Sequence, residues 1–90
     1  MNVPASGNLS GSVLDDRGAA VPGVTVTATG VGAPQVQVTD DAGQFRFLGL
    51  TPGTYSLKTE VEGFMTVNDP NISIVDGRTT TIHVTLTPID

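Results

Sequence analysis

Short runs of alternating apolar and polar residues fill most of the chain, a pattern typical of β-strands with one buried and one solvated face. In the clearest run, residues 24–29, valine or alanine alternates with three threonines. β-Branched threonine suits the outer face of a pleated sheet. The run therefore predicts a half-buried antiparallel strand that directs Val24, Val26 and Ala28 inward.

The most apolar strand is expected at residues 44–48, between two tight turns. In the first turn, residues 40–43, aspartate can hydrogen-bond its own turn and glycine tolerates a positive φ. In the second turn, residues 51–54, proline presets the first corner and glycine supplies the positive φ at the next. Alternation between the turns places Phe45 and Phe47 on one face, which we expect to be buried.

Five further strands follow from the same pattern and bring the total to seven. They are expected at residues 9–14, 35–39, 55–61, 72–75 and 79–86. We expect residues 35–39 to pair with residues 44–48 across the aspartate–glycine turn. Residues 68–71 are expected to form a loop, and Asp76-Gly77, a strong hairpin dipeptide, to join the last two strands.

Strands at spacings of roughly 8 to 12 residues, with turns between them and no helical period, predict an all-β fold. The specific expectation is a seven-stranded antiparallel Greek-key β-sandwich, prealbumin-like or Ig-like. A barrel is the alternative, but glycine-rich corners favour two packed layers. Residues 1–7 are expected to be a flexible lead-in, and residues 8–90 a single domain with a thin core.

Composition excludes several classes of partner and chemistry. Nine acidic against four basic residues give a net charge of −5, whereas nucleic acids and anionic lipids require a clustered basic surface. The chain has no cysteine, which excludes disulfides, thiolate chemistry and the usual structural zinc sites. No apolar run reaches the roughly 18 to 20 residues of a membrane span, and residues 1–8 do not resemble a signal peptide. We therefore expect a longer parent chain whose targeting segment lies elsewhere.

Four pieces in order give the sequence a family resemblance. They are Gly11-Ser12-Val13 with Asp16-Arg17-Gly18, Val21-Pro22-Gly23-Val24-Thr25-Val26, Thr39-Asp40-Asp41-Ala42-Gly43-Gln44-Phe45, and Leu50-Thr51-Pro52-Gly53-Thr54-Tyr55. Together they resemble the carboxypeptidase regulatory-like domain, a family close to the Cna B-type and transthyretin-like domains. The resemblance covers residues 9–64, and the remainder fits the expected last two strands.

This resemblance implies a prealbumin-like sandwich without catalytic activity of its own. Such domains accompany zinc carboxypeptidases, TonB-dependent outer-membrane receptors and the stalks of bacterial surface proteins. The expected function is thus a structural or interaction module of a larger exported bacterial protein, in the periplasm or at the cell surface. Its expected partners are the neighbouring domains of the parent chain and a second protein bound at a sheet edge. In isolation we expect a monomer.

Residues able to carry chemistry are few. His83 is the sole histidine; it falls between two inward residues and is expected to face solvent without a second ligand or a catalytic partner. Lys58 is the sole lysine and also has outward parity, and the first strand contains no lysine. The intramolecular isopeptide crosslink of some Cna B-type relatives is therefore not expected. We expect no catalytic residue, no cofactor and no enzymatic activity.

A ligand-binding module is the alternative function. In an antiparallel sandwich alternate loops gather at one end, which would bring several carboxylates together for Ca²⁺. The weak calcium candidates are Asp15, Asp16, Asp40, Asp41 and Asp69. The simpler interpretation is that these aspartates form turns and solvate loops. Carbohydrate binding at the same loops is the other version, although all four aromatic residues have the parity of core or core-edge positions.

Overall fold

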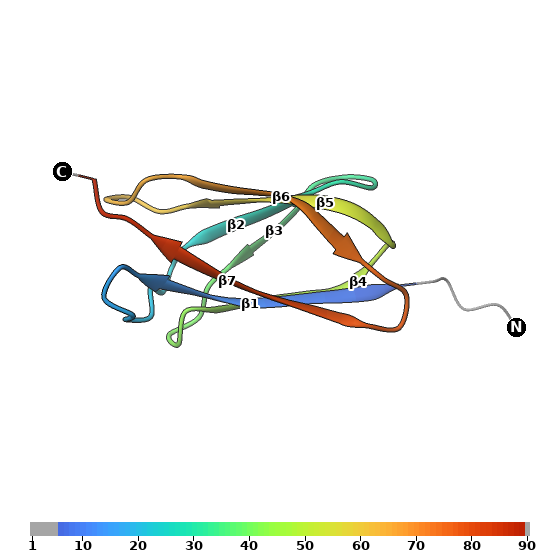
Figure 1. Ribbon diagram of the computed structural model, residues 1–90, viewed down its shortest axis with the longest axis horizontal. Coiled ribbons are helices and arrows are strands. Elements are labelled where there is room, and N and C mark those ends of the chain that lie inside the picture. The colour runs from blue at the N-terminus through green and yellow to red at the C-terminus, as the bar shows by residue number, and fades with distance from the viewer. Residues whose placement is uncertain (1–5, 90) are drawn as a thin grey trace, which may run out of the picture.

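The computed structural model describes residues 6–89, and every regular element within them is a β-strand (Figure 1). This confirms the predicted all-β sandwich of seven strands. The described residues contain no helix long and apolar enough to cross a membrane. The strands are β1 (Gly7–Asp15), β2 (Thr25–Thr29), β3 (Gln35–Val38), β4 (Gln44–Leu50), β5 (Gly53–Glu60), β6 (Val67–Ile74) and β7 (Thr79–Leu86).

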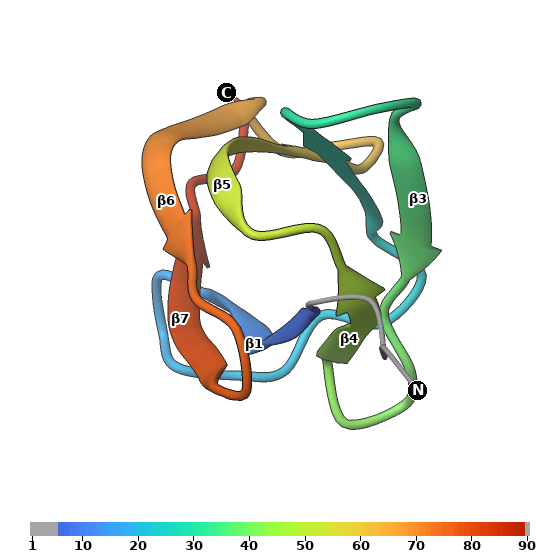
Figure 2. The same cartoon turned by 90° about the vertical axis from the view of Figure 1, so that its right-hand side faces the viewer.

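Two sheets form the layers of the sandwich, visible end-on in Figure 2. One has the order β4-β1-β7 and the other the order β3-β2-β5-β6. Every neighbouring pair is antiparallel except β1 and β7, which run parallel. The expectation of a wholly antiparallel sandwich is wrong at this pair, because the first and last strands are not joined by a turn and can meet in either direction.

The core lies between the sheets and contains the residues whose parity predicted burial. Phe45 and Phe47 pack edge to face with ring centroids 6.0 Å apart, a favoured aromatic geometry. Phe64 is partly buried against the core, as expected for a residue at its edge. The other buried apolar side chains are Leu9, Val13, Val21, Val24, Val26, Ala28, Leu50, Tyr55, Leu57, Ile72, Ile74, Val84 and Leu86.

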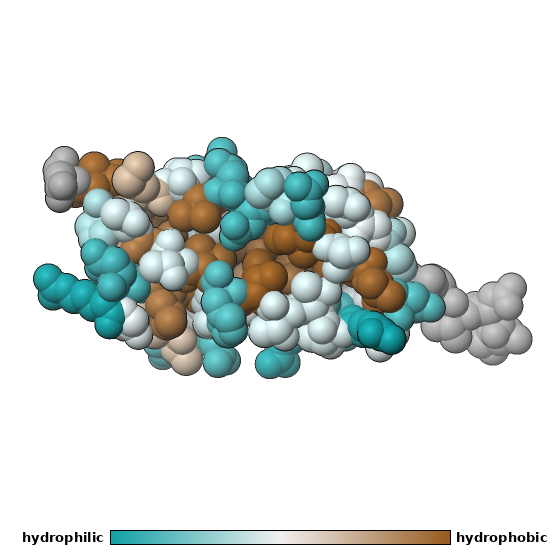
Figure 3. All heavy atoms as spheres, in the orientation of Figure 1, coloured by the Kyte–Doolittle hydropathy of each residue, from teal (hydrophilic) through white to brown (hydrophobic). Residues whose placement is uncertain are grey.

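Apolar side chains are not fully covered on the side where β6 and β7 meet. The face in Figure 3 shows them gathered along the opening between these two strands. Val67 of β6 and Ile82 of β7 are only partly buried there. This incomplete cover follows from the topology, because β6 and β7 are the outer strands of different sheets and form no ladder with each other.

The predicted pairing of residues 35–39 with residues 44–48 is wrong. The turn between them does close, since Gly43 N–H donates to Asp40 O at 2.9 Å and Asp40 N–H to Gln44 O at 3.0 Å. Beyond the turn, β3 continues along β2 while β4 crosses to β1. The strands separate because β4 must bury its two phenylalanines, whereas every residue of β3 is exposed.

Thr39 fixes the point at which these strands separate. Its side chain is buried; Oγ1 donates to the carbonyl of Val21 at 2.8 Å and accepts from the N–H of Val24 at 2.9 Å. The backbone N–H of Thr39 also donates to Val24 O at 3.0 Å. One threonine thereby satisfies the backbone of the corner that precedes β2 and holds the end of β3 against it.

The loop predicted at residues 68–71 is instead part of β6. Its proline is accommodated by a bulge: Tyr55 pairs with Ile72 and Leu57 with Asp69, so two residues of β6 oppose Ser56. Asn71 has a φ of 63°, a left-handed conformation that asparagine adopts more readily than most residues. A bulge leaves Pro70, which has no N–H, outside the regular ladder.

The prediction of a hairpin at Asp76-Gly77 is also wrong. The dipeptide does form a tight turn, in which Arg78 N–H donates to Val75 O at 3.1 Å. The strands on either side belong to different sheets, so the turn crosses the sandwich. Ser6 is held at this turn: its N–H donates to Asp76 Oδ1 at 3.1 Å and its carbonyl accepts from Gly77 N–H at 2.9 Å.

The expected lead-in therefore divides into two parts. Residues 1–5 lie outside the described residues, whereas Ser6 is hydrogen-bonded and Gly7 is buried as the first residue of β1. A Cβ on Gly7 would lie 2.8 Å from the side chain of Ile74, against the opposite sheet. Gly7 is therefore part of the sandwich. The two sheets approach so closely at this position that only glycine fits.

Thr59 is buried on β5, and its Oγ1 has no hydrogen-bond partner within the described residues. We expect Thr59→Val to raise the free energy of unfolding by about 1 kcal/mol, because an unsatisfied buried hydroxyl is destabilising. Chemical denaturation measures the change. Thr59→Ser, which keeps the hydroxyl and removes a buried methyl, is expected to lower stability by about 1 kcal/mol. A less stable valine variant would contradict the prediction.

Candidate functional site

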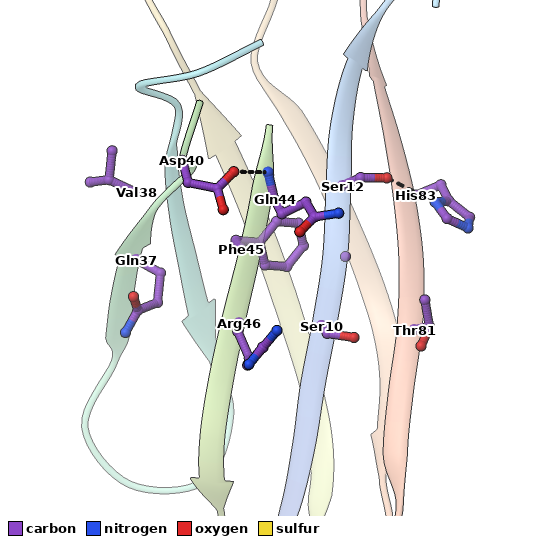
Figure 4. A pocket seen from close by; sticks show the side chains of 11 residues that line it. Ser10, Ser12, Gln37, Val38, Asp40, Gln44, Phe45, Arg46, Thr81 and His83 are labelled. Carbon is purple, nitrogen blue, oxygen red and sulfur yellow. Dashed lines mark hydrogen bonds between the residues drawn. The ribbon is translucent and has the colours of Figure 1, made fainter. Parts of the chain in front are cut away.

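An open groove of about 560 Å³ lies on the outer face of the β4-β1-β7 sheet and is bounded on one side by β3 (Figure 4). Its lining is mostly polar. The residues are Ser10, Gly11, Ser12, Gln37, Val38, Asp40, Gln44, Phe45, Arg46, Thr81 and His83.

The groove exists because the middle strand carries the smallest side chains. Residues 10–12 of β1 are serine, glycine and serine. Ser10 lies between Arg46 of β4 and Thr81 of β7, and the next outward row repeats this arrangement with Ser12 at its centre. Longer side chains on both neighbouring strands rise above this floor, and β3 adds a wall beyond β4 (Figure 4). The short side chains of β1, flanked by those of β4 and β7, thus make the hollow.

Polar contacts within the groove are few. Ser12 Oγ and His83 Nδ1 are 3.0 Å apart and hydrogen-bonded. Asp40 Oδ1 accepts from the backbone N–H groups of Ala42 and Gln44, both at 2.9 Å, so this carboxylate stabilises its own turn. Arg46 forms no ion pair within residues 6–89. The groove can therefore offer hydrogen bonds to a polar ligand through a guanidinium, amides and hydroxyls.

Nucleophilic catalysis is not supported by this geometry. His83 is exposed, as predicted, and the hydrogen bond found for its ring is the one to Ser12. A serine–histidine pair needs a third group that orients the ring and a donor for the developing oxyanion. Asp40, the carboxylate that lines the same groove, is engaged by its own turn. The pair is accordingly a cross-strand contact of two outward residues.

Two of the five calcium candidates, Asp15 and Asp40, act as turn formers. The loops that follow β1, β3 and β5 do gather at one end of the sandwich (Figure 1). Nevertheless, no three acidic or histidine side chains within residues 6–89 are placed to hold a metal ion. Asp16 and Asp41 are exposed, and Asp69 is half-buried within β6 rather than in a loop. Calcium binding therefore remains a prediction from sequence that the structure does not strengthen.

Asp15 shows the turn-forming role most clearly. Its Oδ1 accepts from Ala19 N–H at 2.9 Å and Arg17 N–H at 2.8 Å. These hydrogen bonds, that to Ala19 foremost, lower the pKa of the Asp15 carboxyl below its ordinary value. The charged form is thus favoured in the folded state.

A pH dependence follows from this shift. Because the folded-state pKa is depressed, the contribution of Asp15 to stability is present above its unfolded pKa, about 4, and is lost as the pH falls through the folded value. We expect Asp15→Asn to remove this part of the acid dependence. Denaturation measured at a series of pH values from 7 downward, with Asp16→Asn as the exposed control, tests it. Parallel acid profiles for wild type and Asp15→Asn would contradict it.

Lys58 is the residue considered above for an isopeptide crosslink. Lys58 points outward from β5, as predicted, and its Nζ lies 3.7 Å from Glu60 Oε1 on the same strand. Both side chains are about half exposed. An exposed pair of this kind contributes little to stability. Lys58 lies in the β3-β2-β5-β6 sheet, whereas crosslinking in the Cna B-type relatives requires a lysine on the first strand.

Sequence reasoning did not identify the groove, although it placed His83 on the correct face. Ser10, Ser12, Gln44 and Arg46 alternate with buried residues on their strands, so their outward orientation could have been read from parity. The side-by-side arrangement of these strands could not have been read from parity, because it depends on the parallel β1/β7 pair and on the crossing of β4 to β1.

Fold and site together define a small β-sandwich domain that displays no assembled catalytic group in residues 6–89. A family model described as the carboxypeptidase regulatory-like domain matches residues 8–87. The chain belongs to this family, which confirms the resemblance found in its sequence. No curated protein sequence matches the chain.

Solved structures show the same fold at low sequence identity. The TIE protein of Bacillus anthracis superposes with a TM-score of 0.80 at 19% identity over 94% of this chain and 17% of its own. The minor pilin GBS52 of Streptococcus agalactiae gives a TM-score of 0.72 at 18% identity over 98% of this chain and 47% of its own. Hydroxyquinol 1,2-dioxygenase of Pseudomonas putida gives 0.77 at 8% identity, covering 99% and 58%.

Two facts follow from these comparisons. The chain spans less than two thirds of each of these three structural relatives, 17%, 47% and 58% of their lengths. The sandwich also occurs within an enzyme, so fold alone does not decide between a catalytic and a non-catalytic chain. Family membership and the chemistry of the groove are the observations that bear on this question.

Proposed function

We propose that this chain is a non-catalytic spacer and accessory domain of a larger exported bacterial protein. It holds neighbouring domains of the parent chain apart and presents a sheet edge to a second protein. Membership of a regulatory-like family supports the non-catalytic role, and so does the groove, whose histidine is bonded to Ser12 and to no carboxylate of residues 6–89. The similarity to a minor pilin supports an extracytoplasmic location, in the periplasm or at the cell surface.

The observation that carries the spacer role is the position of the start of β1 relative to the end of β7. Because β1 and β7 are adjacent and parallel, the chain enters the sandwich at one end of its long axis and leaves at the other (Figure 1). A domain inserted between two others in this way separates them by its own length. Nine residues of β1 at about 3.3 Å per residue correspond to roughly 30 Å.

The interaction role would use β3. This strand is an outer strand of its sheet, so one side of its backbone has no ladder partner among the strands of residues 6–89. Val36 and Val38 lie on the outer face beside the threonines of β2, and are 55% and 58% exposed. An extended partner segment could add to this edge and cover the valines. The net charge of −5 makes nucleic acid an unsuitable partner.

An exchange in the parent protein tests the spacer function. In one variant the domain is deleted; in another it is replaced by an unrelated domain of equal end-to-end length. A spacer predicts that deletion impairs the parent's function and that the replacement restores it. If deletion has no effect, the proposal is wrong. If the replacement also fails, this chain supplies a specific binding surface instead.

The alternative is binding of a polar ligand, such as a carbohydrate, in the groove. Its volume of about 560 Å³ and its polar lining favour this alternative over the acidic loop end. The lining has no exposed aromatic ring, since Phe45 is buried, so hydrogen bonds alone would have to hold a sugar. Binding to a glycan panel that is lost in Arg46→Ala and retained in Lys58→Ala, on the other sheet, would establish this alternative. Absence of binding would remove it.

A further inference from the structure

The first and last strands form the longest regular ladder in the molecule. β1 and β7 pair over eight consecutive residues, from Asn8 opposite Thr79 to Asp15 opposite Leu86, without a register shift. By contrast, the β1/β4 and β5/β6 ladders each contain an irregularity. The chain enters at the start of β1 and leaves at the end of β7, at opposite ends of the ladder (Figure 1).

Tension applied to the two chain ends would therefore act along this ladder. The start of β1 would be pulled in one direction and the end of β7 in the other, parallel to both strands. All the hydrogen bonds between them would carry the load together, and none could break before the others. A ladder pulled apart from one end instead loses its bonds one at a time, each at about 1 kcal/mol of net stability.

We propose that the β1/β7 ladder is a mechanical clamp, and that this domain transmits tension between the domains on either side of it. The inference rests on the proposed spacer function and adds to it that the spacer bears load. The clamp requires that every pathway of forced unfolding break the β1/β7 ladder. Within residues 6–89, β7 is an outer strand whose one ladder partner is β1, and β1 lies between β4 and β7. The side chain of Thr80 adds a single hydrogen bond from β7 to Ser73 O of β6, at 2.9 Å. Release of either strand must therefore break the β1/β7 ladder.

Hydrogen bonds also flank the ladder at both ends. At the entry, Ser6 is bonded to the Asp76-Gly77 turn, and Asn8 N–H donates to Arg78 O at 2.9 Å. At the exit, Met65 N–H donates to Thr87 O at 2.9 Å and Ile89 N–H donates to Gly63 O at 3.0 Å. These exit bonds would peel first, after which the pull falls on β7.

Burial protects the inner face of the ladder, and a side-chain hydrogen bond supports the outer face. On the inner face, Leu9, Val13 and Leu86 are completely buried, which keeps water from competing for the backbone bonds. On the outer face, the Ser12–His83 hydrogen bond joins the two strands directly. This hydrogen bond on the groove side of the sheet thus strengthens the clamp, and it does not depend on a bound ligand.

Single-molecule force spectroscopy on the wild-type domain tests the clamp in two pulling directions. In the first, the domain is stretched through its N- and C-termini within a chain of reference domains. In the second, it is stretched between its N-terminus and a cysteine introduced at Arg78, which opens the ladder from one end. Because the chain has no native cysteine, attachment is unique. We expect a several-fold higher unfolding force in the first direction. Equal forces would overturn the clamp and leave the spacer function standing.

A matched pair of variants supplies a second measurement. Gly11→Ala disturbs the ladder, because the added Cβ would lie 2.5 Å from Ile82 O. Thr39→Val disturbs the β2/β3 side, outside the ladder. Both are expected to lower equilibrium stability, but forced unfolding reports the barrier that is crossed rather than the equilibrium. We expect a clear loss of end-to-end unfolding force in Gly11→Ala and little in Thr39→Val. Equal losses would show that the ladder is not the mechanical barrier.

Discussion

Replacing Thr39 by valine is expected to lower the free energy of unfolding by about 2–4 kcal/mol, since two buried backbone groups would lose their partner. Oγ1 donates to the carbonyl of Val21 and accepts from the N–H of Val24. Valine has nearly the same shape, so the loss isolates the hydroxyl. The change is measured by urea denaturation, with the slope of the transition checked for constancy.

Serine at the same position is the control. Thr39→Ser keeps the hydroxyl and removes one buried methyl, so it should lose only about 1 kcal/mol. If valine and serine cost the same, the hydroxyl does not stabilise the corner before β2. A clearly larger loss for valine than for serine would show that the hydroxyl stabilises the corner before β2.

Gly11→Ala is expected to lower the free energy of unfolding by about 1–3 kcal/mol, the usual effect of overpacking a tight site. A Cβ at this position would lie 2.5 Å from the carbonyl oxygen of Ile82 and 2.6 Å from Cζ of Phe45. The first neighbour is backbone of the parallel partner strand and cannot move without disturbing the ladder. Thermal or chemical denaturation measures the loss.

Two comparisons separate this steric effect from a general loss of strand stability. Ser10→Ala changes the adjacent outward residue and should leave stability within about 0.5 kcal/mol of wild type. In a Phe45→Leu background, which removes the end of the ring, Gly11→Ala should cost less than in the wild type. A loss that is unchanged by the shorter side chain would mean that the ring is not the obstacle.

The same small residues on β1 serve two purposes. Glycine at position 11 allows β7 and the ring of Phe45 to approach β1 closely, and the serines beside it leave the floor of the groove low. A ligand bound in the groove would lie over the β1/β7 ladder. The spacer, clamp and polar-ligand proposals therefore converge on one sheet, and the exchange, pulling and glycan experiments distinguish them.

Parity along the chain determined the strands and the core. Phe45, Phe47 and Tyr55 are buried, and Lys58 and His83 are exposed, as alternation predicts. This information is local, because a strand of period two shows in its own residues which of its faces avoids water. The four family motifs are local as well, since each consists of a turn and the strand beside it. The fold class and the family were therefore accessible from sequence.

Alternation along the chain did not predict which strands pair with one another. The turns at residues 40–43 and at Asp76-Gly77 were expected to make hairpins, and each instead passes the chain from one sheet to the other. A turn fixes the direction of the next strand only over its first residues. Beyond them, burial of Phe45 and Phe47 against β1, and of Ile72 and Ile74 against the core, decides which sheet each strand joins.

The sequence alone therefore determined which segments extend, which faces are buried and which family the chain belongs to. Tertiary structure alone decided that β1 lies parallel to β7, that the start of β1 and the end of β7 lie at opposite ends of the sandwich, and that a polar groove lies over this ladder. The physical reason is that side-chain alternation records contact with water or core. Strand order is set by how two sheets close over one shared core, and no single strand carries that information.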